Sequence, residues 1–164
     1  MSRTQREMNC TPEEVFGVFE DGWLFAVWVV GASRIRDVDA TWPKADSKIH
    51  HSVGTWPLLI DDTTSVVEID PFRSVRLRAR AWPAGEADVF IEVRQIPAGC
   101  RVTITEDAVK GPGVLVPQPI LDVLLNWRNT ETLRRLAYLA EGQHRPAPVE
   151  PTGPDATPGV IDRG

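Results

Sequence analysis

The chain has 164 residues, with a hydrophobic content of 42% and a charged content of 25%, which is the composition of one ordinary globular domain. Its net charge of -5 and its isoelectric point of about 5.2 disfavour nucleic acid or an anionic membrane as a partner. No apolar run approaches the roughly 20 residues that a membrane-spanning helix needs, so we expect no membrane span.

The first thirty residues indicate one strand followed by two short helices. The polar, weakly alternating stretch 2–9 predicts an exposed edge strand. Thr11 is followed three residues later by Glu14, which is the capping-box pattern at the start of a helix. Asp21 is placed to cap a second short helix over residues 22–29.

From residue 33 onward the hydrophobic period changes to two, which is typical of strands. The clearest alternation lies where Val75 and Leu77 alternate with Arg76 and Arg78. The predicted strands cover residues 33–38, 48–55, 58–69, 74–81, 88–96 and 100–109. With the first strand they predict an antiparallel meander of six to seven strands that has one polar, Arg-rich face and one apolar face.

Three arginines, Arg76, Arg78 and Arg80, form a row on the polar face of this predicted sheet. Such a row is able to bind anions, but carboxylates on the neighbouring strands offer a simpler explanation. We expect the row to pair across strands, with Glu68, Asp88 and Glu92.

The longest helical pattern covers residues 117–141, where apolar residues recur at spacings of three and four. Gly142 is expected to end this helix. About 23 helical residues make a rod about 35 Å long, and its apolar stripe must be buried on another element. We therefore expect the helix to cover the apolar face of the sheet. The domain comprises residues 1–142, and the Pro- and Gly-rich residues 143–164 are expected to be a disordered tail.

Cysteine and histidine spacing gives no sign of a metal site. Cys10 and Cys100 are far apart in sequence, so we expect two reduced thiols in a cytoplasmic protein. His50 and His51 are neighbours on a predicted strand, where their side chains face opposite sides and cannot hold one ion. We expect no metal and no cofactor, and either a monomer or a homodimer.

Three short patterns occur in the order of a known family. TPEEVF lies at 11–16, TITED lies at 103–107 on the last predicted strand, and RN…L…L…AE closes the long helix at 128–141. In this order the chain resembles the START-like superfamily, also called SRPBCC, and within it the polyketide cyclase/dehydrase and lipid-transport group. The resemblance covers about residues 2–142. It implies a helix-grip α+β fold, in which a curved antiparallel sheet wraps around a long C-terminal helix, but it does not by itself select a function.

This architecture implies an apolar cavity between sheet and helix. The strand positions expected to line it are Ile49, His51, Val53, Ile60, Asp62, Leu77, Ala79, Ile91, Ile104 and Glu106. The helix positions expected to line it are Leu121, Leu124, Leu125 and Arg128, and Phe25 and Trp28 are expected to close one end. A cavity with few polar groups fits a small hydrophobic or aromatic molecule, such as a lipid or a polyketide-like compound.

The polar residues in this set allow two interpretations. In one, His51 and Glu106 are the acid and base of a polyketide cyclase/dehydrase-like enzyme, and Arg128 polarises a carbonyl group or holds a carboxylate. In the other, Glu106 and Arg128 form a buried ion pair in a ligand carrier that has no chemistry of its own. The second is more economical, because charged residues are rarely buried without a partner. A third hypothesis is an interaction module that docks a partner on its Trp-rich short helices or its outer sheet face.

Overall fold

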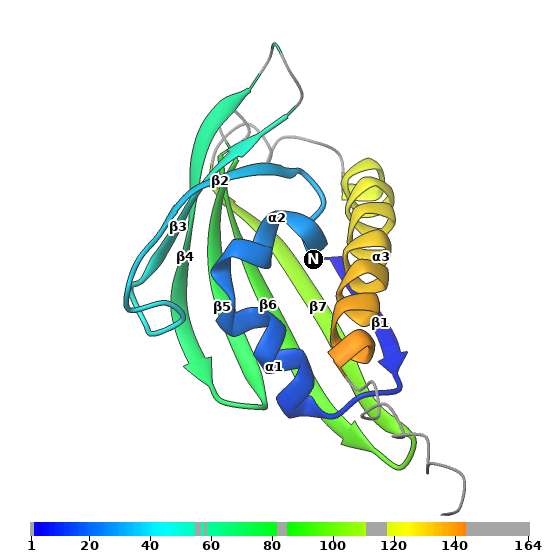
Figure 1. The fold of residues 1–164 in the computed structure, drawn as a ribbon. Coiled ribbons are helices and arrows are strands. Elements are labelled where there is room, and N and C mark those ends of the chain that lie inside the picture. Colours follow the sequence, from blue (N-terminus) through cyan, green and yellow to red (C-terminus); the bar gives the residue numbers. More distant parts are fainter. Residues whose placement is uncertain (1, 55–56, 58, 82–84, 111–117, 144–164) are drawn as a thin grey trace, which may run out of the picture.

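The structure is a computed structural model that describes residues 2–54, 57, 59–81, 85–110 and 118–143, with the backbone alone at 81, 108–110 and 118–122. Seven antiparallel strands form one sheet, short helices follow the first strand, and a long helix closes the described chain (Figure 1). This is the helix-grip α+β fold that the sequence predicts. Of the predicted tail, residues 143–164, Gln143 belongs to the long helix, and residues 144–164 lie outside the described residues.

The strands are β1 (Ser2–Met8), β2 (Ala32–Val38), β3 (Lys48–Val53), β4 (Ile60–Asp70), β5 (Ser74–Ala81), β6 (Gly85–Ile96) and β7 (Gly99–Lys110). The helices are α1 (Pro12–Glu20), the 3-10 helix η1 (Gly22–Leu24), α2 (Phe25–Trp28) and α3 (Gln118–Gln143). The strand order in the sheet is β1-β7-β6-β5-β4-β3-β2. The first strand of the chain is therefore an edge strand, as predicted, and it pairs with the last strand.

The predicted caps hold the short helices in place. Thr11 Oγ1 accepts a hydrogen bond from the Glu14 backbone N–H at 3.3 Å, and the Thr11 N–H donates to Glu14 Oε2 at 2.7 Å. Asp21 Oδ1 accepts from the Trp23 N–H at 3.0 Å. The single second helix that the sequence predicts is divided into η1 and α2, because the first turn after Asp21 has 3-10 geometry.

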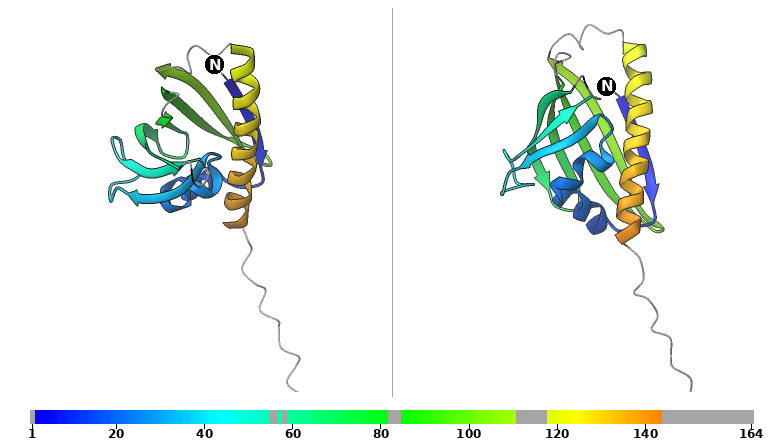
Figure 2. Two further views of the ribbon diagram at one scale, coloured as in Figure 1. Left: turned by 90° about the horizontal axis from the view of Figure 1, so that it is seen from above. Right: turned by 45° about the horizontal axis from the view of Figure 1, so that its top comes forward.

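The sheet is strongly curved, and α3 runs along its open side next to β1, while α1 and α2 cover the concave face (Figures 1 and 2). The prediction that Gly142 ends α3 is wrong, because the helix continues to Gln143. A glycine stops a helix when the chain needs a left-handed residue there, and the backbone at Gly142 remains helical. None of the described helices is long and apolar enough to cross a membrane.

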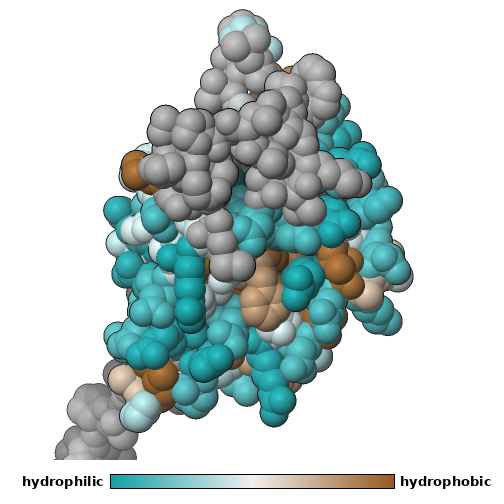
Figure 3. All heavy atoms as spheres, turned by 180° about the vertical axis from the view of Figure 1, so that it is seen from behind, coloured by the Kyte–Doolittle hydropathy of each residue, from teal (hydrophilic) through white to brown (hydrophobic). Residues whose placement is uncertain are grey.

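The outer face of the sheet is predominantly hydrophilic (Figure 3). Its arginine row is paired, as predicted, to carboxylates on neighbouring strands: Arg78 Nε lies 2.8 Å from Asp88 Oδ1, and Arg76 Nε lies 3.9 Å from Glu68 Oε2. Arg80 pairs with Glu86 at 3.7 Å. The prediction was wrong for Glu92, whose carboxylate pairs with Arg94 two residues later on the same strand.

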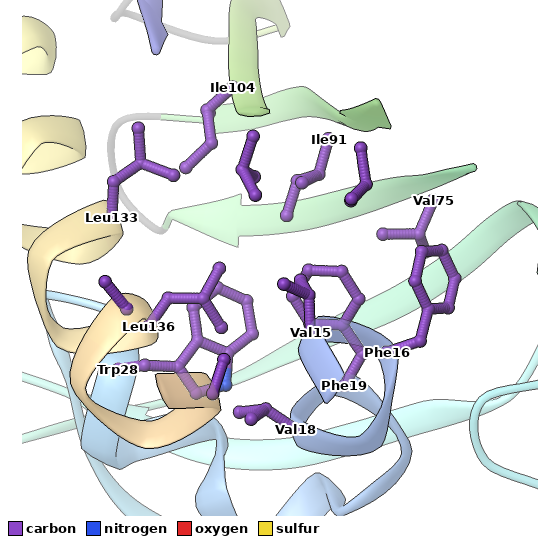
Figure 4. Close-up of a cluster of buried hydrophobic side chains, with 14 of the residues drawn as sticks. Val15, Phe16, Val18, Phe19, Trp28, Val75, Ile91, Ile104, Leu133 and Leu136 are labelled. Atoms are coloured by element: carbon purple, nitrogen blue, oxygen red, sulfur yellow. The ribbon is translucent and has the colours of Figure 1, made fainter. Parts of the chain in front are cut away.

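The hydrophobic core lies between the sheet and the helices. Apolar side chains from α1, α3 and the sheet point toward one another there (Figure 4). They are Val15, Phe16, Val18 and Phe19 of α1, Leu133 and Leu136 of α3, and Val75, Ile91 and Ile104 of the sheet. Among the described side chains of α3, the fully buried apolar residues are Leu133, Leu136, Ala137 and Ala140, which lie in the second half of the helix.

Candidate functional site

A cavity of about 130 Å³ lies between the sheet, α2 and α3. The predicted sheet residues on its wall are Val53, Leu77, Ala79, Ile91 and Ile104. Phe25 and Trp28 of α2 are also on the wall, as are Glu106 of β7 and Arg128 of α3. These five residues share the inward face of their strands because successive side chains of a strand point to opposite faces. The wall is mainly apolar, with its polar groups contributed largely by β7 and α3.

Other residues of the predicted set lie away from this wall. Ile49 is fully buried in the core, and Ile60 and Leu125 are half-buried elsewhere. Leu124 is 59% exposed, contrary to the expectation that it belongs to the inward stripe of α3. The side chain of Leu121 lies outside the described part of the chain.

Several wall residues were not predicted. Thr64 lies two residues after Asp62 on the same face of β4, so the alternation along the strand carries a signal for its inward position. Asn129 and Thr132 of α3 are buried although they are polar. Each lies four residues before a buried leucine, Leu133 and Leu136 respectively. The connection from Val29 to Ala32 also lines the cavity, and an irregular segment carries no periodic signal.

Glu106, Arg128 and Asn129 form a closed hydrogen-bonded network at the cavity wall. Arg128 Nη2 donates to Glu106 Oε2 and, at 3.3 Å, to Asn129 Oδ1. Asn129 Nδ2 donates to the same Glu106 oxygen at 3.2 Å. Glu106 is only 3% exposed, so its carboxylate depends on these two donors for the solvation that water supplies at a surface.

Polar residues on the same part of α3 attach the helix to its surroundings. Asn126 Oδ1 accepts hydrogen bonds from Ser2 Oγ at 3.1 Å and from Thr4 Oγ1 at 3.0 Å, both on β1. Thr132 Oγ1 accepts from the Val30 N–H at 3.2 Å. Hydrogen bonds therefore hold the middle of α3, from Asn126 to Thr132, to β1, to β7 and to the segment after α2, whereas Leu133, Leu136, Ala137 and Ala140 pack in the apolar core.

His51 and Asp62 are buried and lie on directly paired positions of β3 and β4. His51 Nε2 and Thr64 Oγ1 share a hydrogen bond of 2.9 Å, and the His51 ring lies 5.5 Å from that of Phe25. His51 Nδ1 and Asp62 Oδ2 have no hydrogen-bond partner among the described residues. Burial lowers the pKa of His51 below its ordinary value of 6.5 and outweighs the opposing effect of the Asp62 carboxylate.

The structure does not bring His51 and Glu106 together. His51 is on β3 and Glu106 is on β7, so β4, β5 and β6 lie between them in the sheet. His51 is also absent from the cavity wall, which it reaches only through its contacts with Thr64 and Phe25. Each group instead has a local partner: Glu106 is paired with Arg128, and His51 is bonded to Thr64.

The surface also carries exposed apolar side chains. On the short helices, Trp23 is 59% and Val27 is 50% exposed, and on α3 Val123 and Trp127 are each 70% exposed. Among the described residues, no three histidine, cysteine or acidic side chains are grouped as metal ligands would be.

Comparison with known proteins gives matches at the level of structure. No protein-family model and no curated protein sequence matches the chain. Protein CV1439 from Chromobacterium violaceum matches with a TM-score of 0.64 and 18% identity, over 85% of this chain and 96% of that chain. The di-domain ARO/CYC protein StfQ of the steffimycin biosynthetic pathway matches with a TM-score of 0.66 and 10% identity. DynU16, from the dynemicin biosynthetic locus, matches with a TM-score of 0.61 and 18% identity.

The last two matches cover most of this chain and about half of the other protein: 87% against 50% for StfQ, and 86% against 47% for DynU16. Identities this low establish a shared fold and nothing further. The chain therefore shares its fold with CV1439, StfQ and DynU16.

Proposed function

We propose that this chain is a member of the START-like superfamily that binds a small hydrophobic or aromatic molecule in the cavity between its sheet and α3. The observation that carries the proposal is the cavity itself, whose wall is mainly apolar and includes the Glu106–Arg128 pair and one further charged residue, Arg80. An apolar cavity of about 150 Å³ holds a benzene molecule. A cavity of about 130 Å³ is therefore close to the size of one aromatic ring.

The polar part of the wall favours a ligand that carries a hydrogen-bond acceptor. Arg128 uses Nη2 for both of its bonds to described residues, and its side chain is 36% exposed. Its other two guanidinium nitrogens are therefore available to a carbonyl or hydroxyl oxygen of the ligand. A free carboxylate on the ligand is less suitable, because it would lie close to the negative charge of Glu106.

The internal pairing of the polar groups favours binding over acid–base chemistry. A catalytic base needs a lone pair directed at the substrate, and the Glu106 oxygen nearest the network already accepts two hydrogen bonds. His51 is separated from the wall and from Glu106, so the two do not act on one ligand atom. The proposal of an aromatic, polyketide-like ligand is supported by the fold shared with StfQ, an ARO/CYC protein of the steffimycin biosynthetic pathway, and with DynU16, a protein of the dynemicin biosynthetic locus.

The first test is native mass spectrometry of the purified protein, compared with its denatured mass, followed by titration with phenol and 2-naphthol. Binding is monitored by tryptophan fluorescence, because Trp28 is on the wall. Ala79→Trp places an indole ring at the wall and is expected to weaken binding at least tenfold while the protein stays folded. Ala98→Trp makes the same change at an exposed turn and is expected to have no effect. Equal affinities in both variants would place the ligand outside the cavity.

A further inference from the structure

Cys10 and Cys100, which are 90 residues apart in sequence, meet at the end of β1. Their Sγ atoms are 3.9 Å apart, and the two residues are 3% and 0% exposed. Met8 pairs with Cys100 in the last register position of β1 and β7, and Cys10 follows just after the strand ends. Both thiols are free in this structure.

The backbone, and not only the side chains, holds this pair together. Gly99 has a φ of +138°, and a Cβ at this position would lie 2.1 Å from the Met8 carbonyl oxygen and 3.1 Å from the Cys10 nitrogen. The turn before β7 therefore packs directly against the segment from Met8 to Cys10 and leaves no room for a side chain at residue 99. This close backbone contact fixes the two neighbouring cysteines opposite each other.

The surroundings protect the thiols from random modification. Burial raises the pKa of Cys10 to about 12, and burial also raises the pKa of Cys100. The carboxylates of Glu14 and Glu141 act in the same direction. They are held nearby, since Glu14 Oε2 accepts from the Thr11 N–H and Glu141 Oε1 accepts from the Asn9 N–H. Because the thiolate is the reacting form, both thiols are expected to react slowly with reagents in solution while the protein is folded.

We propose that Cys10 and Cys100 are a reversible oxidation site, at which a low-molecular-weight disulfide such as oxidised glutathione drives formation of an intramolecular disulfide. A disulfide has an S–S distance of about 2.05 Å, so the two sulfur atoms must approach by about 1.9 Å. Their adjacency favours closure of the ring over an intermolecular bond, because the second thiol is already beside the first.

The exchange is balanced in two steps. The thiolate of one cysteine attacks a sulfur of oxidised glutathione, which forms a mixed disulfide and releases one glutathione thiolate. The thiolate of the second cysteine then attacks the protein sulfur of the mixed disulfide and releases the second glutathione. The two cysteines lose two electrons and two protons, and glutathione gains both, so no further oxidant is needed.

The disulfide would join the edge strand β1 and the start of α1 to β7. It would close a loop of 90 residues and so restrict the unfolded chain, which is expected to raise Tm by about 5–15 °C. Neither cysteine lies on the wall of the cavity, so ligand binding is expected to stay within twofold in the two redox forms. The inference is thus independent of the proposed function.

The test equilibrates the full chain in buffers of increasing ratio of oxidised to reduced glutathione, starting both from the native reduced protein and from protein refolded out of urea. Refolding removes the slow step that burial imposes on the native thiols. After acid quenching and alkylation, intact mass and peptide mapping identify each oxidised species, and thermal unfolding gives its Tm. Cys10→Ser and Cys100→Ser, which retain one thiol each, are the matched controls.

We expect the refolded protein to lose two hydrogen atoms of mass through a Cys10–Cys100 bond, to gain Tm, and to return to the reduced form when reduced glutathione is added. Neither serine variant should form this species. Glutathione adducts or intermolecular dimers as the main oxidised products would overturn the proposal. An intramolecular disulfide with a lower Tm than the reduced protein would also overturn it, because the bond would then not fit the fold.

Discussion

Replacing Arg128 by methionine removes the positive charge from the Glu106 network and retains most of the side-chain stem. The Glu106 carboxylate, 3% exposed, would keep the Asn129 amide as its remaining donor in the network. Removing one partner of a fully buried ion pair costs about 3–5 kcal/mol. The Arg128 side chain is 36% exposed, so water replaces part of its effect, and we expect a loss of about 2–3 kcal/mol.

A double-mutant cycle separates the pair from the other effects of each substitution. Glu106→Gln removes the negative charge with little change in shape, and in its presence Arg128→Met no longer leaves a buried charge unpaired. The double variant should therefore be more stable than the sum of the single losses predicts, by about 1–2 kcal/mol. The assay is urea unfolding followed by tryptophan fluorescence, which gives the free energy of unfolding for all four proteins.

Arg101→Met is the matched control, because Arg101 pairs with Glu7 at 2.6 Å on the surface, where the two side chains are 44% and 62% exposed. Its expected cost is at most about 0.5 kcal/mol. Additive losses for Glu106→Gln and Arg128→Met, within about 0.5 kcal/mol, would refute the reasoning. The network would then contribute little energy, and Glu106 would be free for another role at the cavity.

Two further predictions concern titration and backbone strain. Burial lowers the pKa of His51, so below its ordinary value of 6.5 the unfolded chain binds more protons than the folded chain, and stability falls as the pH falls. Between pH 7 and pH 5.5, measured by urea unfolding, the free energy of unfolding should fall less in His51→Gln than in the natural protein. Equal losses in the two proteins would assign the pH dependence to other groups. Gly99→Ala places a methyl group against the Met8 carbonyl oxygen and should cost more than about 2 kcal/mol, or prevent folding. Gly31→Ala, at a φ of +110° with no atom within 4 Å, carries the backbone strain without the contact, and equal effects in the two variants would contradict the role of close packing.

Most of the secondary structure was predictable from neighbouring residues in the sequence. Strand β5 lies at its predicted residues because Val75 and Leu77 alternate with arginines over the whole segment. The capping box at Thr11 and Glu14 also needs only neighbouring residues, and it forms as predicted. The inward direction of the His51 side chain was predicted from the alternation along its strand alone, since successive side chains point to opposite faces of the sheet.

The local sequence pattern does not predict which side of helix α3 is buried. The leucine pattern of α3 predicts that Leu124 faces inward, but Leu124 is exposed, while the polar residues Asn129 and Thr132 are buried. Their burial is stabilised by partners far away in sequence, Glu106 and the backbone of Val30, which no periodicity reveals. The side that a helix buries depends on the surface it meets, and here that surface offers hydrogen bonds as well as apolar contacts.

The sequence by itself thus determined the strand and helix order, the face that most strand residues present, and part of the cavity wall contributed by the sheet, namely Val53, Leu77, Ala79, Ile91, Ile104 and Glu106. The sequence offered the Glu106–Arg128 pair as the more economical of two interpretations, and the structure contains it. The tertiary structure alone decided that His51 meets Thr64 and that Cys10 meets Cys100. Strand parity is a property of two or three consecutive residues. A contact between residues 13, 22 or 90 positions apart is set by the sheet register, the curvature and the docking of α3, which are properties of the whole fold.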